Sequence, residues 1–375
     1  MTSSSKRSRE PCADGVDRLS TMHNDILHNI LSKLDFMDVV KTCVLSKRWR
    51  HVWMSVPCLN FSTDRFMKHT HEMSSYYGFW NFMKMVLLLR NESHIRRISV
   101  SASNNHSPKR AYRAYKLNEL LCIADKLKVE ELCFSGGDSD IEELFFHDDH
   151  GPAHELVFPR VVCETLTMLT VNFRCKTPLR IAQVFSNLKT LYLRRVVISH
   201  DVAHKLLSSG CVKLENMHLQ DCQISSDIEG ISISACNLKN LVIVYVNHGG
   251  KFVVGRSFDS KLKICAPNLV TFCYTGPMPL SFALLNTVSL RHVSICILDL
   301  IMPRHNHEDE LVNEPYPSRF IGLNHAKTLT FSDLVVKVCG HHWLSHFISK
   351  EYYCSLSSIC FFEDMICRLK RCFVW

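Results

Sequence analysis

In residues 17–57 the hydrophobic positions recur at the spacing of short amphipathic helices. From Met22 to Leu34 they lie one, three or four residues apart, which places them on one face of a helix. Asn24 or Asp25 puts a polar or acidic side chain at the start of this helix, where unbonded backbone amides favour it. The pattern therefore predicts a first helix between Met22 and Leu34.

Two more short helices are expected before residue 57. Asp38 can cap a helix that runs to Leu45. Ser46 can cap another that runs to Trp53, after which Pro57 closes the unit. Such helices carry more apolar side chains than they can bury among themselves, because a domain of ~40 residues removes little surface from water. The unit must therefore pack on the rest of the chain or dock on another protein.

Beyond residue 57 a short unit recurs, in which apolar residues occupy the first, fourth and sixth positions. Leu188, Leu191 and Leu193 form one example. Of the five central spacings between units, four lie within the roughly 20–29 residues of a leucine-rich repeat, and the longer outer spacings require insertions. The units begin at Ile95, Val129, Leu166, Leu188, Leu214, Leu238, Leu269, Leu290 and Ala326.

The end of each unit predicts a strand with one buried face, and the stretch after it, such as residues 199–207, predicts a helix. Stacking these units buries their apolar edges and curves the chain. The expected fold over residues 95–335 is an α/β leucine-rich-repeat solenoid, or horseshoe, whose strands line a concave surface where a target protein would bind. Outward positions near that surface are Thr190, Tyr192, Arg194, Asn216, His218, Gln220, Asn240, Val242 and Val244. The candidate target-binding residues are Tyr192, Arg194, His218 and Gln220.

The N-terminal helices resemble the F-box of plant F-box/leucine-rich-repeat proteins. The resemblance rests on the order and spacing of Asp17-Arg18-Leu19-Ser20, Asp25 through Ser32, and Val44 through Trp53. It implies that residues 17–57 bind a SKP-type adaptor, which links to a cullin and a RING subunit in an SCF-type ubiquitin ligase. The expected adaptor-binding residues are Leu19, Met22, Ile26, Ile30, Leu31, Leu34, Val44, Leu45 and Trp49, with Trp49 contributing most.

The resemblance implies a substrate-recognition subunit whose repeats hold a target for ubiquitination. Met22 and His23 stand where the family usually carries Leu-Pro. Without the proline a fixed φ angle and a contact are lost, so weaker adaptor binding is expected. Arg48 and Arg50 are expected to solvate the edge of the docking surface. The alternative is a leucine-rich-repeat interaction scaffold without ligase association, in which the N-terminal helices serve only as a cap.

Three further segments complete the expected domain organisation. Residues 1–16 are polar and charged, and are expected to be a disordered tail. Residues 58–94 are expected to be a helical linker or capping segment. Members of the family with this layout often end in a further small domain, the FBD domain, and residues 336–375 are expected to be a diverged or shortened form of that end.

Charge and cysteine content narrow the expected partners and compartment. The formal net charge of +8 over 375 residues is spread along the chain, so no nucleic-acid partner is expected. The 18 cysteines follow a polar N-terminus without a secretory pattern, which predicts reduced thiols in the cytoplasm or nucleus. Lys6, Arg7 and Arg9 form a weak basic cluster of the nuclear-import kind. The sequence has no run of about 18 apolar residues, so no membrane association is expected.

Motifs of metal, nucleotide and hydrolase chemistry are missing from the sequence. It contains no CxxC, HExxH, Walker A, GxGxxG or GxSxG pattern. With 18 cysteines and 21 histidines, chance pairs are too frequent for sequence order to identify a catalytic cysteine. No catalytic residue, metal site or cofactor is therefore expected, and the chain is expected to be a non-catalytic adaptor subunit.

Overall fold

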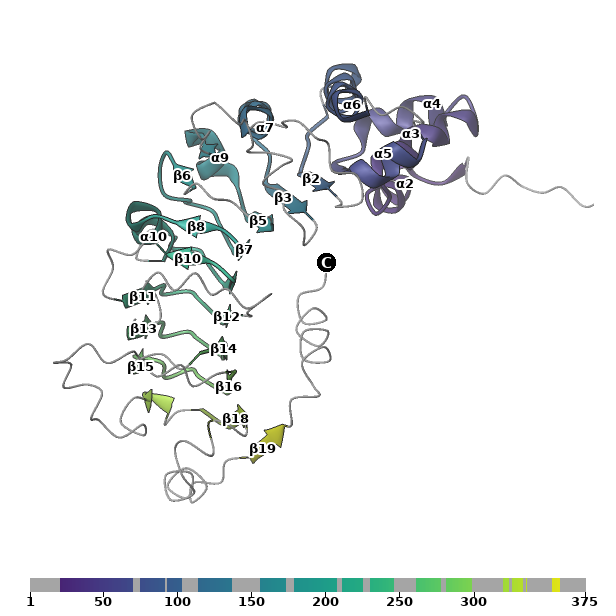
Figure 1. The fold of residues 1–375 in the computed structure, drawn as a ribbon. Helices are drawn as coiled ribbons and strands as arrows, with labels where there is room; N and C mark the ends of the chain where they lie inside the picture. Colours follow the sequence, from purple (N-terminus) through teal and green to yellow (C-terminus); the bar gives the residue numbers. More distant parts are fainter. Residues whose placement is uncertain are drawn as a thin grey trace, which may run out of the picture.

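A sheet of parallel strands runs through most of the computed structural model of the chain (Figure 1). In the described residues it has 11 strands, whose order across the sheet is their order in the sequence. They are β1 (Cys58–Ser62), β2 (Arg97–Ala102), β3 (Glu131–Gly136), β5 (Met168–Asn172), β7 (Thr190–Arg194), β9 (Asn216–Gln220), β12 (Asn240–Val244), β14 (Thr271–Gly276), β16 (His292–Ile297), β18 (Thr328–Ser332) and β19 (Tyr353–Ser357).

The structure describes residues 21–69, 75–91, 93–102, 114–136, 156–172, 179–207, 211–224, 230–245, 261–277, 281–298, 320–323, 326–332, 335 and 353–357. The expected tail at residues 1–16 and the adaptor-binding candidate Leu19 lie outside these ranges.

Each of the nine predicted repeat units contains a strand of this sheet. In β7, Leu191 and Leu193 are buried, whereas Tyr192 between them is only partly buried. Neighbouring strands are parallel and in register, with Leu191 opposite Met217 of β9. The predicted α/β leucine-rich-repeat solenoid is thereby confirmed.

Two strands of the sheet lie outside the predicted repeats. β1 opens the segment 58–94, which we expected to be helical, and Val56, Leu59 and Phe61 keep the spacing of the repeat unit. Two helices follow it, α5 (Thr63–His69) and α6 (Ser75–Leu89). At the other end, β19 lies within segment 336–375 and pairs with β18. The sheet therefore extends beyond the predicted repeats in both directions.

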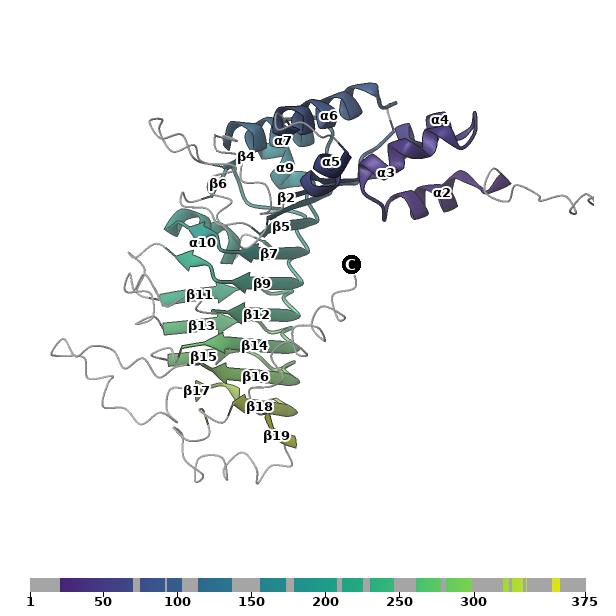
Figure 2. The same cartoon turned by 45° about the vertical axis from the view of Figure 1, so that its right-hand side comes forward.

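The outer layer of the solenoid changes from helices to strands along the chain (Figures 1 and 2). Its first part contains α7 (Ala114–Lys126), α9 (Arg160–Thr165) and α10 (His200–Leu207), with the short pairs β4 (Val157–Phe158) with β6 (Arg180–Ile181) and β8 (Val197–Ile198) with β10 (Gln223–Ile224). The helix predicted at residues 199–207 is thus present. Farther along, a second parallel sheet replaces the helices, formed by β11 (Gly230–Ser234), β13 (Lys261–Cys265), β15 (Ser281–Leu285) and β17 (Phe320–Ile321). Residues 230–234, Gly-Ile-Ser-Ile-Ser, show the two-residue alternation typical of a strand.

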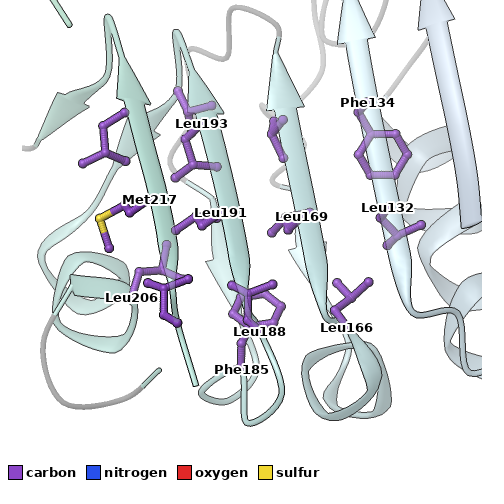
Figure 3. Packing of buried hydrophobic residues seen from close by; sticks show 14 of the residues in the cluster. Leu132, Phe134, Leu166, Leu169, Phe185, Leu188, Leu191, Leu193, Leu206 and Met217 are labelled. Carbon is purple, nitrogen blue, oxygen red and sulfur yellow. The ribbon is translucent and has the colours of Figure 1, made fainter. Parts of the chain in front are cut away.

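The hydrophobic core lies between the two layers and continues from repeat to repeat. Figure 3 shows Leu132, Leu169 and Leu191 in successive strands, with Phe185 and Leu206 packed beneath. These residues belong to one buried cluster that extends from Leu27 to Val335 and so includes residues of the N-terminal helices. Each repeat therefore buries its apolar edge against its neighbours and cannot form a core alone.

Asparagine side chains join the turns of adjacent repeats. Asn187, Asn237 and Asn268 each precede the first leucine of a unit. Their amide nitrogens donate to backbone carbonyls of the preceding repeat: Glu164 (2.6 Å), Val212 (2.8 Å) and Cys236 (2.8 Å), respectively. These bonds satisfy turn carbonyls that the parallel sheet leaves unpaired.

The N-terminal helical unit, residues 21–57, contains α2 (Asn24–Leu31), α3 (Phe36–Lys41) and α4 (Trp49–Val52), with the 3₁₀ turns η1 (Thr42–Val44) and η2 (Trp53–Ser55). The three predicted helices are present, but two of their caps differ. Asp35 caps α3 by accepting from the Met37 amide at 2.9 Å, one turn before the predicted Asp38. α4 begins at Trp49 without a side-chain cap, so Ser46 does not cap it.

No helix of the described residues is both long and apolar enough to cross a membrane.

Candidate functional site

Large apolar side chains are exposed on the N-terminal helical unit. Along α2 and the turn after it, Ile26, Ile30 and Leu34 are 49%, 43% and 39% exposed. At η1, Val44 is 88% and Leu45 is 58% exposed. A concentration of exposed large hydrophobic residues in one small unit is typical of a protein-binding surface.

Leu31 and Trp49, which we expected in the docking surface, are core residues. They are 1% and 4% exposed. Leu27 and Leu31 lie one turn apart on the inward face of α2, so Ile30 and Leu31 necessarily point to different sides. Trp49 is buried in the same core as Trp53. Both residues therefore leave the candidate adaptor-binding set, and the expectation that Trp49 is its main contact is corrected.

Polar contacts hold the start of α2, where His23 stands in place of the proline that the resembled family usually carries. Nδ1 of His23 accepts a hydrogen bond from the Asp25 amide at 3.5 Å and caps the helix. Nη2 of Arg48 donates to Oδ1 of Asn24 at 2.6 Å and also to the Met22 carbonyl. Met22 itself is half-buried and packs against the core. Arg48 thus ties α4 to the start of α2.

The four candidate target-binding residues lie together on the concave face of the sheet. Strand pairing places Tyr192 opposite His218 and Arg194 opposite Gln220. The rings of Tyr192 and His218 meet edge to face, with centroids 4.5 Å apart. The Tyr192 hydroxyl donates to Oε1 of Gln220 at 3.2 Å. Nη1 of Arg194 donates to Oδ1 of Asn172, on the next strand, at 3.4 Å. We call Tyr192, Arg194, His218 and Gln220 the concave cluster.

Burial determines the charge of the concave cluster. It lowers the pKa of His218 to about 4, and the positive charge of Arg194 acts in the same direction. Burial also raises the pKa of the Tyr192 hydroxyl, while Arg194 opposes that shift. At neutral pH both rings are therefore uncharged, and Arg194 supplies the positive charge of the cluster.

The other outward candidates divide into a polar ladder and a buried pair. Nδ2 of Asn240 donates to Oδ1 of Asn216 at 2.8 Å, and Nδ2 of Asn216 donates to Oγ1 of Thr190 at 3.4 Å. Val242 and Val244, by contrast, are only 1% and 8% exposed. These two valines, expected as outward positions near the concave surface, are therefore buried in the structure.

The cysteines of the described residues are free thiols, and many of them are buried. Burial raises the thiol pKa of Cys163 and Cys211 to about 11 and that of Cys222 to about 12. Such thiols stay protonated and behave as small apolar side chains. Within the described ranges, no three histidine, cysteine, aspartate or glutamate residues are grouped to hold a metal ion.

Comparison with known families assigns the two parts of the chain. The F-box domain family matches residues 19–61. Residues 129–256 match the leucine-rich repeats of the FBD-associated F-box protein At5g56370. This chain has an F-box followed by leucine-rich repeats.

Curated relatives from Arabidopsis thaliana are named as F-box proteins, and two of the three described here are also named as leucine-rich-repeat proteins. FBD-associated F-box protein At4g13985 is 27% identical over 236 residues, which cover 62% of this chain and 48% of the relative. Putative F-box/FBD/LRR-repeat protein At1g66300 is 22% identical over 336 residues, covering 86% of this chain and 65% of the relative. Putative F-box/LRR-repeat protein At3g58880 is 28% identical over 279 residues, covering 72% and 55%. The F-box chain thus spans about half to two thirds of the length of these relatives.

Several residues of the F-box and of the concave face were not predicted as part of these sites from the sequence. The F-box match runs to residue 61 and includes all of β1 except Ser62, so this strand belongs to both the F-box and the repeat sheet. The spacing of Val56, Leu59 and Phe61 would have shown this. Thr170 and Asn172 lie opposite Tyr192 and Arg194 on β5. Extending the alternation of outward positions by one strand would have placed both beside the concave cluster.

Proposed function

We propose that this F-box protein is the substrate-recognition subunit of an SCF-type ubiquitin ligase. Its F-box docks on a SKP-type adaptor, which joins it to a cullin and a RING subunit, and its repeats bind the target protein. The family matches support both halves of this assignment. We place the assembly in the cytoplasm or nucleus, where thiols remain reduced.

The observation that carries the proposal is the exposed apolar surface of the F-box. Ile26, Ile30, Leu34, Val44 and Leu45 remain exposed even though the F-box shares a core with the repeats. Packing against the repeats therefore leaves these side chains in water, and a partner can bury them. Burial of an apolar side chain contributes about 1.5–3 kcal/mol, so a few such contacts suffice for stable docking.

The proposed mechanism is proximity. The concave face of the repeats holds a target while the F-box tethers it to the ligase, so a target lysine meets the charged conjugating enzyme at high effective concentration. In this scheme the chain contributes binding and orientation, and bond formation takes place on its partners.

The proposal is tested with the full chain and a purified plant SKP-type adaptor. The test variant is Ile30→Asp combined with Val44→Asp, because both side chains are exposed and neither is needed in the core. The matched control is Leu88→Asp on α6, where another leucine is 77% exposed outside the F-box. Trp49→Ala is unsuitable, since loss of a buried indole would unfold the F-box itself.

We expect the wild type and the α6 control to retain the adaptor in a pulldown, and the double variant to lose it with an unchanged circular dichroism spectrum. Failure of the wild type to bind would reject the ligase assignment. The alternative would then lead: a repeat scaffold whose N-terminal helices only cap the solenoid. The core shared by the F-box and the repeats is compatible with a capping role, so adaptor binding is the measurement that separates the two.

A further inference from the structure

The turn between α2 and α3 of the F-box lies against the first strand of the repeat sheet. In the described part of the chain β1 pairs with β2 alone, so β1 is the edge strand at this end of the sheet. Figure 2 shows α2 and α3 beside the start of the sheet. Proteins often cover an open sheet edge with a helix or a loop, and here the F-box occupies that position. Contacts between β1 and the turn therefore determine how the F-box is placed on the repeats.

Asn60 of β1 holds the end of α2 through its side-chain amide. Its Nδ2 donates to the Ser32 carbonyl at 2.8 Å and to the Leu34 carbonyl at 3.1 Å. Nη2 of Arg97 donates to Oδ1 of the same amide at 3.5 Å, so the oxygen faces Arg97 and the nitrogen faces the turn. Carbonyls at the C-terminal end of a helix have no partners within the helix. Asn60 therefore supplies donors that this turn would otherwise take from water.

The next two residues of β1 fix the rest of the turn. The ring of Phe61 packs against Phe36, with centroids 5.3 Å apart. Burial raises the pKa of the Asp35 carboxyl, and a hydrogen bond from the Ser62 backbone to that carboxyl opposes the rise. These contacts do not involve the Asn60 side chain. A substitution of Asn60 should therefore loosen the turn without unfolding the F-box.

The turn held by Asn60 carries part of the exposed apolar surface of the F-box. Leu34, whose carbonyl accepts from Asn60, is 39% exposed. Ile30, two residues before Ser32, is 43% exposed. A partner can bury both side chains only when they are held in one arrangement. A protein whose binding-competent arrangement is only partly populated binds more weakly in the same proportion.

We propose that Asn60 is a positioning residue of the adaptor-docking surface, so that the first strand of the repeat sheet shapes the surface of the F-box. The inference rests on the proposed function, because it concerns the same docking surface. In this role Asn60 acts through Leu34 and not as a contact of the adaptor.

The test measures the affinity of the full chain for a purified plant SKP-type adaptor by isothermal titration calorimetry. Asn60→Asp keeps the size of the side chain and an acceptor for Arg97, but its carboxylate cannot donate to the two carbonyls. Asn60→Ala removes the amide altogether. We expect both variants to bind the adaptor about five- to tenfold more weakly, because loss of these hydrogen bonds lowers the population of the docking arrangement.

Asn237→Ala is the matched control. It removes a comparable bond, in which an asparagine amide donates to the Val212 carbonyl at 2.8 Å, from a turn within the repeats. Its unfolding midpoint in urea should fall about as far as the midpoint of Asn60→Ala, while its adaptor affinity should equal that of the wild type. This comparison separates positioning of the docking surface from a general loss of stability.

A double-mutant cycle tests whether Asn60 acts through Leu34. Asn60→Asp combined with Leu34→Ala should weaken binding by less than the product of the two single effects, because a truncated side chain no longer depends on the position of the turn. The same cycle with Val44→Ala should be multiplicative, since Val44 lies on η1 and not on the turn whose carbonyls Asn60 binds.

Three results would each overturn the inference: wild-type affinity in both Asn60 variants, an equal loss of affinity in Asn237→Ala, or a multiplicative cycle with Leu34→Ala. Weaker binding by Asn60→Asp alone would indicate an effect of the added charge and would overturn it as well. If the wild type binds and the Asn60 variants bind equally, this inference fails alone. If the wild type does not bind the adaptor, the ligase assignment fails, and this inference fails with it.

Discussion

The ring of Phe36 in the F-box lies 5.3 Å from the ring of Phe61 in β1. Both residues are almost fully buried. On the same strand, Nδ2 of Asn60 donates to the Ser32 carbonyl at 2.8 Å, which ties the end of α2 to the sheet. Nη1 of Arg90, after α6, donates to the Trp53 carbonyl at 3.3 Å. The F-box and the first repeats are therefore one packed body and not two domains on a linker.

Substitution of Phe61 by alanine should destabilise the F-box and the repeats together. Removal of a buried phenylalanine from a shared core costs about 3–5 kcal/mol, because the cavity closes only partly. The measurement is urea unfolding followed by two signals: tryptophan fluorescence, to which Trp49 and Trp53 in the F-box contribute, and circular dichroism of the whole chain. Both midpoints should fall by the same amount.

Leu88→Ala on the exposed side of α6 is the control, and its midpoint should change little. If Phe61→Ala lowers the fluorescence midpoint while the circular dichroism midpoint stays in place, the F-box unfolds by itself and the single-body description is wrong. Deletion of residues 17–57 should likewise destabilise the repeats, so it does not distinguish a cap from a docking module.

The repeats could be predicted from the sequence because each unit repeats the same local rule. Leu188, Leu191 and Leu193 are the apolar positions of one unit, and Leu191 and Leu193 alternate with polar residues as a half-buried strand requires. Stacking the units buries all three, so the repeated pattern is sufficient to predict the core. β1 was missed because its unit directly follows the F-box helices. The outer strands β11 and β13 were missed because the stretch after each repeat strand was expected to be helical, with residues 199–207 as the example.

The docking surface could be predicted only in part, because periodicity identifies an apolar residue but not what covers it. Ile30 and Leu31 are adjacent apolar residues on the same helix, yet one is 43% and the other 1% exposed. Only the position of β1 and of the other helices decides which of them faces inward. For the concave cluster the strand period placed Tyr192 and His218 on one face, while their ring contact depends on the register between strands.

Asn237→Ala should destabilise the solenoid by about 1 kcal/mol, because it leaves the Val212 carbonyl without the donor that reaches it at 2.8 Å. Lys239→Ala removes a surface ion pair with Glu215, also at 2.8 Å, and should cost less than about 0.5 kcal/mol. Urea midpoints of the two variants give the comparison. Equal losses would show that the turn asparagines contribute no more than a solvated ion pair.

Cysteine reactivity should follow burial. Cys122 and Cys236 are exposed, whereas Cys163, Cys211 and Cys222 are buried and have thiol pKa values raised to about 11 or 12. Brief iodoacetamide treatment at pH 8, followed by peptide mass spectrometry, should label the first two cysteines rapidly. The other three should be labelled only in urea, since the thiolate is the reactive form. Rapid labelling of Cys222 in the native chain would contradict the burial of this side chain.

The titration of His218 should make stability depend on pH in a direction fixed by its environment. Its pKa is lowered from 6.5 to about 4 in the folded chain, so the unfolded chain binds the proton more tightly. The stabilising contribution of the neutral imidazole is therefore complete above about pH 6.5 and is lost as the pH falls towards 4.

Other groups also titrate in this range: burial lowers the pKa of His28 and raises the pKa of Asp35. The test therefore compares the wild type with His218→Gln, so that the contributions of the other groups cancel. As the pH falls from 6.5 to 4, the urea midpoint of the wild type should decrease more than the midpoint of His218→Gln. Arg194→Gln should raise the pKa of His218 without restoring it to 6.5, because burial is the larger cause, and the imidazole proton shifts in NMR measure this directly. Parallel midpoint curves for the wild type and His218→Gln would mean that His218 is solvated in the folded chain.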